Sequence, residues 1–202
     1  MLLGETGQIK ESLTQLQQLL PIQQQVLGPN HPNTLTTRTH IAYRQAELGR
    51  TQEAITDLQQ LTVDIEQALG SKHPDLLTIQ NNLASCLLEA GRLDEAAEQF
   101  EQLVTDSTCS LGFNHPDTLV ARSNLASCLD EIGHTNEAAA QFQQLIVDQQ
   151  KIFGANHQTV FTSRNNLAYC LGKAGQIDEA IQQLQELLEI TKIGRASCRE
   201  RV

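Results

Sequence analysis

The fold is decided by a repeated stretch, and one copy of it reads HPDTLVARSNLASCLDEIGHTNEAAAQF over residues 115–142. Its first residue recurs at intervals of 42 residues, as His31, His73, His115 and His157. A glycine keeps the same interval, as Gly7, Gly49, Gly91, Gly133 and Gly175. Several independent markers at one period indicate an internal repeat.

Aligned on these markers, the chain divides into consecutive repeats. We expect a partial repeat at 1–30, complete repeats at 31–72, 73–114 and 115–156, and an incomplete repeat at 157–192. Together they predict a single array over residues 1–192.

Each repeat is predicted to contain two helices. In 73–114 the first helix opens at Pro74 and Asp75, because Pro fits the first turn and Asp favours its positive end. It should stop at Gly91, since glycine readily adopts the left-handed backbone that ends helices. The second helix should begin at an N-cap, a position held by Asp94, Asn136 and Asp178. No segment alternates apolar and polar residues for long enough to predict a strand.

The apolar face of each helix requires a partner helix. Leu83, Ala84 and Leu87 need the second helix of their own repeat and the first helix of the next one. Aromatic residues make up only 3% of the chain, so the core must consist mainly of aliphatic side chains. These features predict an all-α solenoid of antiparallel helix pairs.

The order Leu83-Ala84, Leu87, Gly91, Ala96, Phe100 resembles the tetratricopeptide signature, and the 42-residue length is similar to the subclass found in kinesin light chains. The resemblance covers about residues 1–192. It implies a right-handed α-solenoid whose first helices line a concave face. It also implies a binding scaffold, and repeats of this subclass occur attached to kinase or nucleotide-binding domains.

Two residues depart from the repeat pattern. Pro21 lies inside the second helix of the partial repeat and should kink or split it, because Pro removes one helix hydrogen bond. Gln158 replaces the Pro at the start of the last repeat, so that turn should be less rigid.

Both ends of the chain also depart from the repeat. Residues 1–7 align with 85–91, the middle of a first helix, so we expect a fragment that begins inside a repeat. Residues 193–202 resemble the translation of a common sequencing adapter, and we expect a non-native tail there. The rival interpretation is a basic tail with a functional Cys198.

Composition restricts the class of partner. The formal net charge of −10 argues against sequence-independent binding to nucleic acid or to anionic lipid. No stretch approaches the roughly 20 apolar residues that cross a bilayer, and no leader opens the chain. We therefore expect a soluble, cytoplasmic protein.

The periodic His and Cys residues are candidates for metal binding or for thiol chemistry. His ligands of zinc must meet at bonds of about 2 Å, whereas repeat-related positions should lie roughly 8–10 Å apart. We therefore expect the His residues to act at the turns or as helix caps. The cysteines Cys86, Cys128 and Cys170 should be small buried packing residues, and His40 and His134 should be exposed. No phosphate loop or nucleophile motif is present, so neither an enzyme nor a cofactor is expected.

A polar stripe on the first helices is the candidate site. By the resemblance it would line the inner groove, where amides bond a peptide backbone and tyrosines anchor it. Its candidate peptide-binding residues are His40, Tyr43, Asn82, Ser85, Asn124, Ser127, Asn166 and Tyr169. The alternative is that the Asn residues are merely solvated or join neighbouring helices.

Two functions follow from these observations. The leading hypothesis is a protein-interaction scaffold that holds an extended peptide or partner segment on its concave face. The alternative is a regulatory or architectural arm of a larger signalling protein, whose ligand would be another part of the same parent chain.

Overall fold

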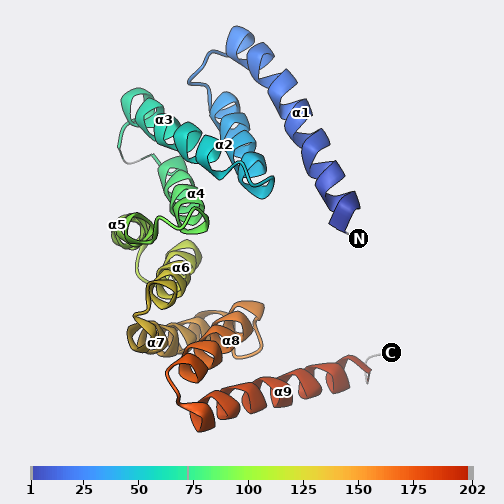
Figure 1. The fold of residues 1–202 in the computed structure, drawn as a ribbon, viewed down its shortest axis with the longest axis vertical. Coiled ribbons are helices and arrows are strands. Elements are labelled where there is room, and N and C mark those ends of the chain that lie inside the picture. The colour runs from blue at the N-terminus through green and yellow to red at the C-terminus, as the bar shows by residue number, and fades with distance from the viewer. Residues whose placement is uncertain (1, 72, 200–202) are drawn as a thin grey trace. The chain divides into compact units, whose positions relative to one another are not determined.

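The computed structural model describes residues 2–71 and 73–199, with side chains over 6–71 and 73–188. In these residues the chain is helical and contains no strand (Figure 1). The helices are α1 (Leu2–Val26), α2 (Pro32–Glu47), α3 (Thr51–Leu69), α4 (Asp75–Glu89), α5 (Leu93–Leu111), α6 (Pro116–Ile132), α7 (Thr135–Phe153), α8 (Gln158–Lys173) and α9 (Ile177–Arg199). This confirms the predicted all-α fold.

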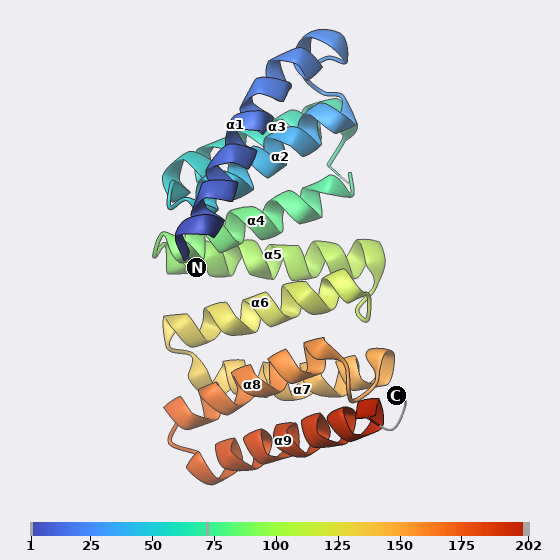
Figure 2. The ribbon, with the colours of Figure 1, turned by 90° about the vertical axis from the view of Figure 1, so that its right-hand side faces the viewer.

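The chain forms two compact units, an N-terminal unit of residues 1–106 and a C-terminal unit of residues 107–202. In the N-terminal unit α2 packs against α1 and α3, and α3 packs against α4. In the C-terminal unit α7 packs against α6 and α8, and α8 packs against α9. Figure 2 shows α8 and α9 running in opposite directions, as expected of a helix pair joined by a short turn.

The periodic histidines cap the first helices, as predicted. The Nδ1 atom of His31 accepts a hydrogen bond from the backbone N–H of Asn33 at 3.2 Å, two residues further along the chain. His73, His115 and His157 make the same contact, each at 3.3 Å, with the N–H of Asp75, Asp117 and Thr159. Each contact satisfies one of the N–H groups that a helix start leaves without a partner. His157 caps α8 even though Gln158 follows it instead of Pro.

The glycine that ends a first helix adopts the predicted left-handed backbone. Gly91 has φ of +73°, its N–H donates to the Leu88 carbonyl, and the Arg92 N–H donates to the Leu87 carbonyl. These two bonds form the Schellman arrangement that closes a helix on its last free carbonyls. The chain can therefore turn back within three residues and begin the next helix.

Small residues bring the two helices of a repeat together. Ala84 of α4 and Ala126 of α6 are fully buried, and so are Ala96 of α5 and Ala138 of α7. The absence of a larger side chain at these points allows helix axes to approach to roughly 8 Å.

A polar contact that the sequence analysis did not single out also joins the two helices of a repeat. Arg38 of α2 pairs with Asp64 of α3 at 2.7 Å, and Arg122 of α6 pairs with Asp148 of α7 at 2.9 Å. The two pairs occupy equivalent positions, because Arg38 and Arg122, like Asp64 and Asp148, are 84 residues apart, which is twice the repeat length. In the remaining repeats the contact is Gln80 with Asp106, and Arg164 with Glu186.

Two sequence-based expectations about the helices need correction. Pro21 does not split its helix, because α1 runs without interruption through it; the neighbouring hydrogen bonds suffice to continue the helix past one missing donor. Gly7, the first member of the glycine series, lies inside α1 and differs in this from Gly91. Asp94, Asn136 and Asp178 are not N-caps, since α5, α7 and α9 begin before them, at Leu93, Thr135 and Ile177. The carboxylates of Asp94 and Asp178 lie in the first turn of α5 and α9, where they favour the positive end of the helix.

Candidate functional site

In the N-terminal unit the predicted site residues lie on α2 and α4. His40 and Tyr43 of α2 are exposed, with 46% of Tyr43 accessible. Asn82 and Ser85 of α4 are half-buried. The Ser85 hydroxyl donates to the carbonyl of Asn81, in the preceding turn of its own helix. The Ser85 hydroxyl proton is therefore already used in a hydrogen bond, and only the lone pairs of its oxygen can bind a ligand.

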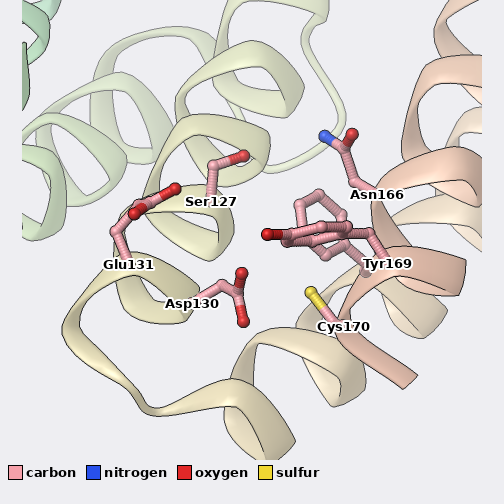
Figure 3. A pocket seen from close by; sticks show the side chains of 7 residues that line it. Ser127, Asp130, Glu131, Asn166, Tyr169 and Cys170 are labelled. Carbon is pink, nitrogen blue, oxygen red and sulfur yellow. The ribbon is translucent and has the colours of Figure 1, made fainter. Parts of the chain in front are cut away.

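In the C-terminal unit three of the predicted residues surround one hollow, with a volume of about 140 Å³. They are Ser127 of α6 and Asn166 and Tyr169 of α8 (Figure 3). Asn124 of α6 is half-buried and does not line it. The hollow thus lies between two consecutive first helices, and the remaining lining residues are Asp130, Glu131, Phe142 and Cys170.

Asp130 is the buried charge of this hollow, with only 4% of the residue exposed. Its Oδ2 accepts a hydrogen bond from the Lys173 ammonium at 2.9 Å, and its carbonyl oxygen accepts another at 3.1 Å. Its Oδ1 is also buried and has no hydrogen-bond partner in the described part of the chain. Figure 3 shows Asp130 pointing from α6 toward Cys170 and Tyr169.

Lys173 links three features of the site. Its hydrogen bond to Asp130 raises the pKa of its ammonium, and the charge of the same carboxylate adds to the effect. Its Nζ also lies 5.6 Å from the centroid of the Tyr169 ring, within range of a cation–π contact. Tyr169 itself is 62% exposed, so most of the ring is accessible to a ligand.

The thiols near the hollow are poor nucleophiles. Burial, and then the charge of Asp130, raises the pKa of Cys170 to about 11. Burial, and then the charge of Glu131, raises the pKa of Cys128 as well. Thiols react as thiolates, so these groups are unreactive at neutral pH. Cys86, Cys128 and Cys170 are buried, which confirms their predicted packing role, and Cys109 of α5 is exposed.

Asp130 was not predicted as a site residue, although the sequence contains a signal for it. The equivalent positions in the other repeats are Ala46, Leu88 and Gly172, none of them charged. A carboxylate at a position where the other repeats have small or apolar residues can be recognised as unusual only when its burial is known. Glu131 lies one helical turn after Ser127 on α6 and was not among the predicted site residues either.

The hollow offers more hydrogen-bond acceptors than donors. Asp130 and Glu131 are carboxylates, and the Ser127 hydroxyl donates to the Ser123 carbonyl of its own helix at 3.1 Å. Asn166 contributes an amide with both functions. Such a site suits a ligand that donates hydrogen bonds.

Over the described residues no cluster of His, Cys, Asp and Glu could hold a metal ion, and no helix there is long and apolar enough to cross a membrane.

Two family models match the chain, and both describe a tetratricopeptide repeat. One matches residues 1–63 and 46–105, and the other matches residues 118–159 and 160–193. No match was found among curated proteins.

Solved structures of similar fold include a variant of a kinesin-light-chain protein from Podosopora anserina with nearly identical TPR-like repeats. It has 29% identity and a TM-score of 0.82, over 95% of this chain and 91% of that one. BtubC from P. vanneervenii has 19% identity and a TM-score of 0.72, over 93% and 72% of the two chains. PlcR from Bacillus thuringiensis, solved with the peptide PapR7 and DNA, has 19% identity and a TM-score of 0.68, over 96% and 70%.

Proposed function

Because the chain belongs to the tetratricopeptide repeat family, we propose that it binds an extended peptide or partner segment on the polar faces of its first helices. Repeats of this family generally mediate protein–protein interactions. The proposal is supported by PlcR, a protein of similar fold that was solved in complex with the peptide PapR7.

The observation that carries the proposal is the hollow between α6 and α8. Three of the predicted peptide-binding residues line it, and its volume of about 140 Å³ is close to that of a cavity, about 150 Å³, that holds a benzene molecule. It can therefore receive one side chain, while the backbone of the ligand stays outside.

The residues at the rim supply what a peptide backbone needs. The half-buried amide of Asn166 can donate to a carbonyl and accept from an N–H. Tyr169 offers a large, rigid surface with few internal rotations to lose, which is typical of residues that dominate binding energy.

The buried thiols are consistent with a reducing compartment, so a cytoplasmic location is part of the proposal.

The test is a selection of extended peptides against the full chain, followed by affinity measurements on variants. Asn166→Ala and Tyr169→Ala should each weaken the selected peptides about tenfold, which corresponds to about 1.4 kcal/mol. Val147→Ala is the matched control, because Val147 is an exposed apolar residue on the second helix α7. Circular dichroism would establish that all three variants are folded. Equal affinity of the selected peptides for all the proteins would show that binding occurs elsewhere.

A further inference from the structure

The Asp130 carboxylate has one oxygen in use and one without a partner. Lys173 donates to Oδ2, and the thiol of Cys170, a weak donor, interacts with the same carboxylate. Oδ1 is buried and has no other hydrogen-bond partner in the described part of the chain. Leaving a buried carboxylate oxygen without a donor is unfavourable. Since Asp130 lines the hollow, a ligand seated there could supply the missing donor.

The charges around the hollow do not balance. Asp130 and Glu131 contribute two negative charges, and Lys173 contributes one positive charge. Glu131 is exposed and forms no ion pair with any of the described residues. One additional cation would bring the three groups to neutrality, whereas an acidic group would face repulsion from both carboxylates.

The shape of the hollow favours a flat cation on a long stem. The accessible ring of Tyr169 forms one side, and the buried ring of Phe142 also lines it. A guanidinium group stacks on an aromatic ring and presents several donors in one plane. An ammonium is more strongly hydrated and acts as a point charge, and Lys173 already occupies that role at Oδ2.

We propose that the hollow between α6 and α8 is a specificity subsite for an arginine side chain of the bound segment. The guanidinium donates to Oδ1 of Asp130, its charge is balanced by Glu131, and its plane lies against Tyr169. This inference rests on the proposed function only because the arginine belongs to the bound segment. The chemistry of the subsite does not depend on that function.

The probe is Nα-acetyl-arginine methylamide, compared with the citrulline analogue, which has nearly the same shape and no charge. Each is titrated into the full ¹⁵N-labelled chain, and the side-chain amide of Asn166 and the backbone amide of Tyr169 are followed by NMR. The arginine probe should shift both signals in a saturable way. The citrulline probe at the same concentrations should bind at least tenfold more weakly, because it cannot neutralise the carboxylates.

Variants separate the subsite from a general effect of charge. Glu131→Gln should weaken the arginine probe about threefold, the size expected of one solvent-exposed charge. Glu89→Gln is the matched control, because Glu89 is the equivalent residue on α4 and is preceded by Leu88 instead of an aspartate. It should leave the affinity unchanged. Asp130→Asn should remove the preference for arginine over citrulline.

Asp130→Asn could also disturb folding, since it leaves Lys173 without its charged partner. Tyr169→Leu therefore provides a second test, because this exposed ring can be replaced without opening the core. It should weaken the arginine probe at least threefold through loss of stacking. Equal binding of arginine and citrulline, or arginine binding that neither Glu131→Gln nor Tyr169→Leu alters, would overturn the subsite.

The outcome is distinguishable from that of the proposed function. Selected peptides that bind without any preference for arginine would refute the subsite and leave the interaction function standing. An arginine probe that binds as described, while no peptide is selected, would support the subsite and refute the interaction function.

Discussion

The Nη2 atom of Arg122 lies 2.9 Å from Oδ2 of Asp148, which joins α6 to α7 by an ion pair whose side chains are only 12% and 9% exposed. Gln144, one turn before Asp148, donates to the other carboxylate oxygen at 3.1 Å. The carboxylate is thus bonded from both helices of the repeat. The equivalent pair of Arg38 and Asp64 is more accessible, at 20% and 27%.

Removal of one partner from the buried pair should therefore cost much stability. Asp148→Ala leaves the Arg122 guanidinium buried without its counter-ion, and we expect a loss of about 3 to 5 kcal/mol in the free energy of unfolding. Asp64→Ala, in the more accessible pair, should cost about 1 kcal/mol or less. Urea titrations followed by circular dichroism would compare the two. Similar losses in both variants would mean that burial does not determine the strength of these contacts.

The Asp64 pair should make stability depend on pH. Burial by itself raises the pKa of Asp64, but hydrogen bonds from Gln60 and Arg38 and the charge of Arg38 outweigh it and hold the pKa below the ordinary value of 3.8. Since the folded-state pKa is the lower one, the stabilisation is complete above the unfolded pKa and is lost as the pH falls through the folded pKa.

The expected outcome is that Asp64→Asn flattens the fall in stability below about pH 4, relative to the unmodified chain. Urea midpoints measured from pH 2.5 to 6 would show this difference. Asp57→Asn is the control, because Asp57 is an exposed carboxylate on the same helix. An Asp57 variant that flattened the curve as much would point to general charge repulsion.

The thiols should differ sharply in their reactivity. Cys109 is exposed and should be alkylated by iodoacetamide within minutes at pH 8. Cys86 and Cys170 should react only on unfolding, because they are buried and burial raises the pKa of each to about 11. Peptide mass spectrometry would assign each modified residue. Rapid labelling of Cys86 or Cys170 in the native chain would contradict their packing role.

The histidine caps should contribute measurably to helix stability. His115→Ala removes the acceptor for the Asp117 N–H, and we expect a loss of about 1 kcal/mol. His115→Asn should restore most of it, because Asn is a favourable N-cap. His134→Ala is the control, since His134 precedes α7 without a side-chain cap bond. Equal losses from His115→Ala and His134→Ala would rule out a capping role.

The amino-acid sequence alone was sufficient to predict where the helices lie and where most of them begin or end. The positions of His115 and Gly91 predicted a start and a stop, because a cap bond spans two residues and a Schellman turn spans six. The burial of Cys128 and Ala84 followed from their place in the apolar stripe of one helix. These features depend on neighbours within a few residues, so they can be predicted from local sequence.

Contacts between helices were decided only by the tertiary structure. Arg122 and Asp148 are 26 residues apart, and Asp130 and Lys173 are 43 residues apart. Whether such side chains meet depends on how two helices are rotated and offset against each other, which the repeat period does not specify. Of the eight predicted site residues, the structure gathers Ser127, Asn166 and Tyr169 around one hollow. The buried carboxylate that gives this hollow its charge became apparent only when α6, α7 and α8 were packed together.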